Sequence, residues 1–68
     1  SLFMKIWVNG TETFLKKKCT ASSLLAHLNV SGRFAVEING KIVTRNNFDS
    51  VIISEDDRVE IVKAIGGG

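Results

Sequence analysis

The sequence predicts an α+β fold: a mixed sheet of four to five strands with one main helix packed on one face. Two Asn-Gly dipeptides, each between runs of strand composition, indicate two β-hairpins. A single leucine-rich stripe with helical spacing lies between them, and another alternating run follows the second hairpin. The 68 residues suffice for one small domain, because a chain of this size buries only about 60% of the surface that its unfolded form exposes. Little of the chain is left to build a deep catalytic pocket.

The first hairpin is predicted over residues 4–15. Residues 4–8 alternate between an apolar face and a less buried face that carries Trp7. Asn9 and Gly10 follow, the pair that best tolerates the positive φ angles of a type I′ turn, and residues 11–15 resume a strand composition. The two runs should therefore pair as antiparallel strands.

A short helix is predicted after the polar connection formed by three lysines at residues 16–18. Thr20 is its natural N-cap, since a threonine hydroxyl accepts a hydrogen bond from an amide of the first turn. Asn29 and Gly32 mark the exit from the helix. The apolar stripe has the spacing i, i+3, i+4 and i+7 and consists of Ala21, Leu24, Leu25 and Leu28.

The second hairpin is predicted from residues 34–39 and 41–43, which flank the turn at Asn39 and Gly40. Residues 45–48 are too polar and too short for a strand, so they indicate a turn or one helical turn with Phe48 as its anchor into the core. Residues 51–53 are apolar and are expected to continue the buried layer.

The last strand is predicted over residues 58–65, where Val59 and Ile61 share one face and Glu60 and Val62 share the other. The order β-β-α-β-β-β fits the β-grasp, or ubiquitin-like, architecture. We interpret residues 4–65 as this domain and residues 66–68 as a flexible glycine tail. Residues 1–3 precede Met4, which is typical of a natural initiator, and are interpreted as a cloning remnant or an N-terminal extension.

Composition excludes several kinds of partner. Nine Lys and Arg against seven Asp and Glu give a formal charge of +2, too small a bias for a surface that contacts several phosphates. No uninterrupted apolar run exceeds three residues, whereas a helix that spans a bilayer needs about 20. We therefore expect neither nucleic acid nor a membrane as partner. Cys19 is the single cysteine and has no disulfide partner in the chain, which indicates a reducing cytoplasm.

The three glycines at residues 66–68 follow the element that should complete the core. Glycine has no Cβ, so such a segment is thin enough to carry its carboxylate into the narrow active site of another protein. The chemistry that suits it is carboxyl activation, in which the Gly68 carboxylate attacks the α-phosphate of ATP and forms an acyl-adenylate on the partner enzyme. The alternative is a cloned linker or a frayed chain end.

The order and spacing of these elements resemble the ThiS-type sulfur carriers of thiamin thiazole biosynthesis over the whole of residues 4–68. The resemblance rests on Met4-Lys5-Ile6-Trp7-Val8-Asn9-Gly10, on Thr20 with Leu24, Leu25 and Leu28, on Val36-Glu37-Ile38-Asn39-Gly40-Lys41-Ile42-Val43, on Arg45, on Asp57-Arg58-Val59-Glu60-Ile61-Val62, and on Ala64-Ile65-Gly66-Gly67-Gly68. Two positions depart from the family pattern: Asp56, where the family commonly has Gly, and Thr44, where Pro often precedes the arginine.

The resemblance implies a function. An E1-like enzyme would adenylate the Gly68 carboxylate at the expense of ATP, and a sulfur donor such as a cysteine desulfurase would convert it to a thiocarboxylate. Thiazole synthase would then take the sulfur. Gly68 would carry the reacting carbon, Gly66 and Gly67 would keep the approach narrow, and Ile65 would be the last packed residue. By this resemblance the chain binds no cofactor and is a protein co-substrate rather than an enzyme.

Three other functions remain open. The small subunit of molybdopterin synthase uses the same thiocarboxylate, and a ubiquitin-like modifier would join Gly68 to a lysine amine of a target protein. A non-covalent β-grasp interaction module would use a sheet edge or face and leave the glycines inert. For partner contact, the outward residues of the last strand suggest an apolar surface made of Val62, Ala64, Ile65 and Phe48, with Trp7 as another candidate member.

The remaining reactive side chains suggest no catalytic or metal site. Cys19 is interpreted as a partly buried thiol whose pKa the neighbouring lysines would lower somewhat. His27 falls off the apolar stripe and is expected on the solvent face without a companion ligand. Lys16, Lys17 and Lys18 are expected to form a solvated connection.

Overall fold

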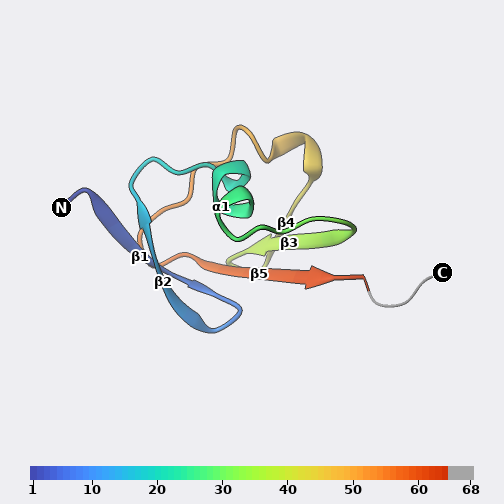
Figure 1. Cartoon of the computed structure of the whole chain (residues 1–68), viewed down its shortest axis with the longest axis horizontal. Coiled ribbons are helices and arrows are strands. Elements are labelled where there is room, and N and C mark those ends of the chain that lie inside the picture. Colours follow the sequence, from blue (N-terminus) through green and yellow to red (C-terminus); the bar gives the residue numbers. More distant parts are fainter. Residues whose placement is uncertain (65–68) are drawn as a thin grey trace.

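The computed structural model describes residues 1–64, which form one mixed sheet with a helix on one face (Figure 1). The first strand begins at Phe3, one residue before Met4. The elements in chain order are β1 (Phe3–Val8), β2 (Thr11–Lys16), α1 (Ala21–His27), β3 (Phe34–Ile38), β4 (Lys41–Val43), the short 3-10 helix η1 (Arg45–Asn47) and β5 (Arg58–Lys63). No helix in this part of the chain has the length and apolar character needed to cross a membrane.

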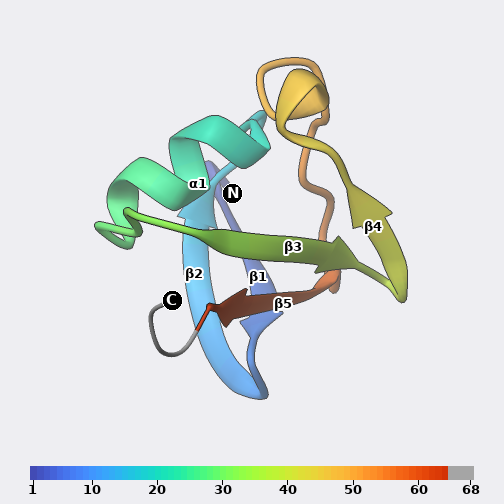
Figure 2. The same ribbon diagram turned by 90° about the vertical axis from the view of Figure 1, so that its right-hand side faces the viewer.

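The five strands lie in the order β2-β1-β5-β3-β4. The last strand therefore lies in the middle of the sheet, where it is parallel to β1 and antiparallel to β3. Figure 2 shows the opposite directions of β3 and β5. Both hairpins are antiparallel, so the sheet is mixed. This arrangement confirms the predicted β-grasp fold with five strands and one helix on one face.

Both predicted hairpin turns are confirmed by their backbone angles. Asn9 and Gly10 have φ of 49° and 81°, and Asn39 and Gly40 have φ of 53° and 83°. Positive φ at both central residues is the signature of a type I′ turn, whose twist matches that of the flanking strands. Asparagine and glycine occupy these positions because they adopt the left-handed region at the lowest cost.

The core lies between α1 and the sheet. The Thr20 hydroxyl accepts a hydrogen bond of 3.1 Å from the amide of Ser23, which confirms the predicted N-cap. The helix ends at His27, and Leu28 is its half-buried C-cap. The buried apolar side chains are Met4, Ile6, Leu15, Ala21, Leu24, Leu25, Val36, Ile53 and Val59.

The connection from β4 to β5 covers one end of this core. Its first turn is η1, and Phe48 then packs on Phe34 with ring centroids 6.0 Å apart, as expected for an anchor residue. The expectation that residues 51–53 are all buried is wrong for Ile52, whose side chain is 54% exposed, while Ile53 is buried. An extended backbone directs successive side chains to opposite sides, so Ile53 reaches the core and Ile52 does not.

Candidate functional site

Residues 65–68, called the C-terminal segment below, follow the end of β5. Ala64 follows this strand, and its amide donates a hydrogen bond of 3.0 Å to the carbonyl of Arg33. Strand β3 pairs with β5 as far as Phe34–Lys63, whereas β1 pairs only with Arg58 and Val59, so the backbone up to Ala64 is held from the β3 side. Four residues with predicted roles, Ile65, Gly66, Gly67 and Gly68, lie outside the described residues.

The side chain of Asn9 holds the second half of β5. Its Oδ1 accepts a hydrogen bond of 2.7 Å from the amide of Ile61, and its Nδ2 donates one of 3.1 Å to the carbonyl of the same residue. The amide of Asn9 also donates to the carbonyl of Val59. The β1–β5 ladder itself pairs only Trp7 with Arg58 and Val8 with Val59, so Asn9 extends the attachment beyond the end of β1.

Asn39, in the other hairpin turn, holds the first residues of β5. Its Oδ1 accepts from the amide of Arg58 at 2.9 Å, and its Nδ2 donates to Oδ1 of Asp57 at 2.9 Å. The other carboxylate oxygen of Asp57 accepts from the amide of Ser54 at 2.8 Å. The Asn-Gly pattern predicts both asparagines as turn residues but does not indicate this second role. Both turns carry Asn at the first central position, where Asp or Gly would also adopt positive φ. This repetition was the available signal for a role of the Asn side chains.

The surface beside the base of the segment is apolar with a basic rim. Val62 is 62% exposed on the sheet face opposite α1, and Ala64 is exposed just beyond the strand. The cross-strand neighbour of Val62 is Ala35, whose small side chain leaves a shallow hollow. The hollow is lined by Arg33, Phe34, Ala35, Val62, Lys63 and Ala64. Two of the predicted surface residues, Val62 and Ala64, are thus close together and accessible.

Phe48 does not share this surface with Val62. It stacks on Phe34, and Phe34 points to the helix side of the sheet because it alternates with the outward Ala35. Phe48 is half-buried there, and its carbonyl accepts a hydrogen bond from the amide of Ser22 on α1. The sheet therefore separates Phe48 from the exposed Val62.

Trp7 lies on the open face of the sheet, as expected from the alternation in β1. Its ring is half-buried beneath two cationic side chains: the Lys5 ammonium is 5.2 Å and the Arg58 guanidinium 5.9 Å from the ring centroid. Cations at this distance are attracted to the face of an aromatic ring. The middle of the open face thus presents positive charge over an aromatic ring.

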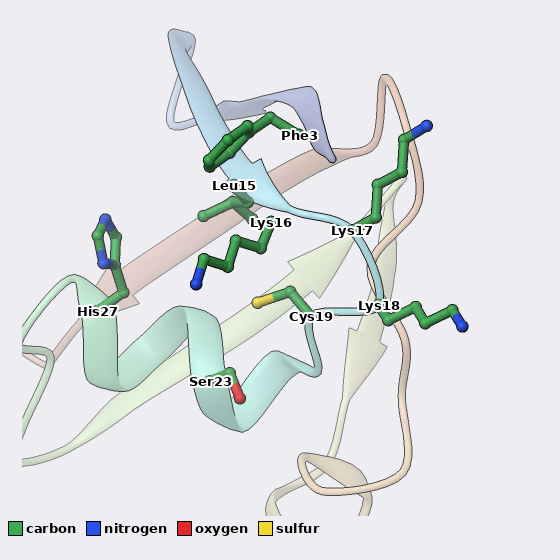
Figure 3. A pocket seen from close by; sticks show the side chains of 8 residues that line it. All are labelled: Phe3, Leu15, Lys16, Lys17, Lys18, Cys19, Ser23 and His27. Carbon is green, nitrogen blue, oxygen red and sulfur yellow. The ribbon is translucent and has the colours of Figure 1, made fainter. Parts of the chain in front are cut away.

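Cys19 lines a pocket between the end of β2 and α1, shown in Figure 3. Its Sγ contacts the carbonyl of Thr20 at 3.4 Å. Burial raises the pKa of the Cys19 thiol, so the expectation that the lysines lower it is wrong. Figure 3 shows one reason why the lysines do not lower this pKa: the side chains of Lys17 and Lys18 point away from the Cys19 thiol. A partly buried thiol with a raised pKa is a poor nucleophile.

His27 is exposed at the end of α1, as predicted. Within residues 1–64, no three side chains of the metal-binding types come together in a way that would hold a metal ion. The raised pKa of the Cys19 thiol gives no indication of an activated nucleophile at this residue. The candidate functional site is therefore the end of β5, the central strand, which the C-terminal segment follows in the sequence.

Known proteins with this arrangement are similar over almost the whole chain. A family model described as the ThiS family matches residues 6–68. The crystal structure of the thiamine biosynthesis protein ThiS from Geobacter metallireducens superposes with a TM-score of 0.83 at 30% identity, and the match covers 96% of this chain and all of that one.

Two curated relatives are larger proteins. The thiazole synthases of Paramagnetospirillum magneticum and Magnetococcus marinus are 39% and 38% identical over 66 residues, which is 96% of this chain. The chain spans only 20% of the length of each. A segment similar to this chain is therefore part of each of these longer proteins.

The strand order and the match to the Geobacter structure define a small β-grasp protein. Because the family model spans nearly all of the sequence, the chain belongs to the ThiS family of sulfur carriers.

Proposed function

We propose that this chain carries sulfur for thiazole formation as a thiocarboxylate on Gly68. The observation that carries the proposal is the family match, which extends through the three glycines to residue 68. Further support comes from β5, which the sheet and two asparagine side chains hold in place, with a backbone hydrogen bond as far as Ala64. A fixed base lowers the entropy lost when the segment enters the active site of a partner.

The proposed reaction has two steps. First, the Gly68 carboxylate attacks the α-phosphate of ATP on an E1-like enzyme, an acyl-phosphate bond forms and pyrophosphate leaves. Second, a sulfur nucleophile from a cysteine desulfurase attacks the acyl carbon and AMP leaves; a thiol reductant supplies two electrons where the sulfur arrives as a persulfide. Activation belongs to the partner enzymes, so this chain needs only an accessible carboxylate.

Thiazole synthase is the proposed acceptor of the sulfur. Two relatives named thiazole synthase contain a segment similar to this chain within the same polypeptide. This pairing favours thiazole formation over molybdopterin synthesis. The surface proposed for contact with partners consists of Val62, Ala64 and Ile65 with the basic rim of Arg33 and Lys63.

The test is intact mass spectrometry after incubation with the E1-like enzyme, ATP, the desulfurase, cysteine and a thiol reductant. We expect a mass gain equal to the exchange of one oxygen for one sulfur, located in the C-terminal peptide. Deletion of Gly68, or Gly67→Trp, should abolish the gain without unfolding the domain. An unchanged mass, with the enzymes active on another carrier, would favour the non-covalent interaction module instead, and conjugates to lysine would favour the modifier.

A matched pair of variants tests the contact surface. Val62→Glu should slow adenylation because it places a charge in the proposed apolar contact. Ile42→Glu is the control, since Ile42 is similarly exposed at 73% and lies on the same sheet face, but on the edge strand β4. Equal rates for the two variants would remove Val62 from the contact surface and leave the carrier chemistry untouched.

A further inference from the structure

The outer edge of β2 is open to a further strand. Among the strands of residues 1–64, β2 is terminal in the sheet order and has β1 as its only neighbour. The amide of Lys17 donates to the carbonyl of Leu2 at 3.0 Å, directly beyond the pair Phe3–Lys16. Hydrogen-bonded and non-hydrogen-bonded pairs alternate along an antiparallel ladder. Thr11, Thr13 and Leu15 therefore bond to β1, and the intervening residues direct their backbone groups outward.

Three residues of β2 have outward backbone groups: Glu12, Phe14 and Lys16. All three are exposed, and the phenyl ring of Phe14 is 62% exposed, which is unusual for an aromatic residue. Within residues 1–64 neither Glu12 nor Lys16 has a partner in an ion pair. The edge thus offers hydrogen-bonding groups, an apolar side chain and two opposite charges without partners.

The pattern along this edge is complementary to itself. If a second β2 runs antiparallel with Phe14 opposite Phe14, Glu12 of each copy lies opposite Lys16 of the other. Each of these pairs falls in a hydrogen-bonded position, so each exchanges two backbone hydrogen bonds. A shift of two residues places Phe14 opposite a charged residue, so only the register centred on Phe14 satisfies both the charges and the rings.

We propose that the chain forms a two-fold symmetric dimer by antiparallel pairing of β2 with β2 of a second copy. The two sheets then form one continuous sheet, with a Phe14–Phe14 contact on the two-fold axis and a Glu12–Lys16 pair on either side. A closed two-fold interface uses the same edge of both copies and leaves no β2 edge open for growth of a fibre. The other edge strand, β4, has three residues and is too short to compete.

The length of the paired segment is limited at both ends. Gly10 lies in the turn before β2, and Lys18 after it has φ of 64°, which directs the backbone out of the strand. Few residues contribute to the interface, so the dimer is weak and forms at high protein concentration. Strand β5 lies two strands away from β2 in the sheet, so the pairing does not involve it. The inference does not depend on the proposed function.

Sedimentation velocity of the full chain over a broad concentration range, at low salt, tests the proposal. We expect the mass to rise from 7.4 kDa toward that of two chains. E12K and K16E should each raise the dissociation constant about tenfold, because the symmetry repeats the like-charge contact in two pairs. The double variant E12K/K16E exchanges the charges and should restore the association of the unmodified protein.

K17E is the matched control, since it makes the same change in net charge as K16E at a residue whose backbone groups face β1. It should not weaken association. Amide resonances that move on dilution should be those of residues 11–16. A mass that stays monomeric at every concentration, a double variant as weak as the single ones, or dilution shifts confined to β4 or β5 would each overturn the proposal. Circular dichroism verifies that every variant is folded.

Discussion

Replacement of Asn9 tests how much the turn side chain contributes to holding β5. Asn9→Gly keeps the left-handed turn but removes both hydrogen bonds to Ile61. A net hydrogen bond contributes about 0.5–1.5 kcal/mol, and water can replace these exposed ones, so the loss should be about 1–2 kcal/mol in total. Asn9→Ala removes the same bonds and costs about 1 kcal/mol more than Asn9→Gly, because alanine adopts a φ of 49° less readily than glycine or asparagine.

Urea denaturation of the two variants measures these differences. Thermal unfolding gives a second readout, since a change of about 1 kcal/mol in a domain of this size shifts Tm by about 4–8 °C. Hydrogen exchange at the Ile61 amide gives a local readout, because its bonding partner in the described structure is Oδ1 of Asn9. Exchange there should accelerate in both variants. If Asn9→Gly matched the unmodified protein in stability and in exchange at Ile61, the reasoning about the side-chain contact would be refuted.

Four further predictions concern three single positions. Asp56→Gly should be about 1 kcal/mol more stable than Asp56→Ala, because φ at this residue is 67° and both variants lose the same exposed ion pair with Lys5; equal melting temperatures would contradict this. Thr20→Ala should cost about 1 kcal/mol through loss of the N-cap bond to Ser23, and Thr20→Ser should restore most of it in thermal unfolding. Because burial raises the pKa of the Cys19 thiol, alkylation should be slower in the native than in the urea-unfolded protein at equal alkaline pH. The same raised pKa gives a stabilising contribution that is complete below the unfolded pKa and is lost as the pH rises through the folded pKa; a variant Cys19→Ala with unaltered pH dependence would exclude it.

The departures from the family pattern have simple backbone consequences. Asp56 adopts a left-handed conformation, which explains why glycine suits this position. Thr44 has φ of −77°, inside the range that proline imposes. Both positions therefore have the backbone geometry expected from the family residue, although the chain carries a different side chain at each.

Local elements were predictable because their signals span only a few residues. The two Asn-Gly turns require positive φ, the Thr20 N-cap requires a hydroxyl before the first turn, and the leucine stripe has the helical period. Alternation likewise assigned Trp7 to the open face of β1 and Val62 to the open face of β5. Each of these features is decided by neighbouring residues, so the sequence alone determined them.

Tertiary structure decided the contacts between residues far apart in the chain. The placement of β5 between β1 and β3, the bonds from Asn9 to Ile61 across 52 positions, and the separation of Phe48 from Val62 depend on how the elements pack. Burial likewise reversed the expected direction of the pKa shift at Cys19. Periodicity specifies which face of an element is apolar but not which element covers it, and the most favourable burial of the whole chain makes that choice.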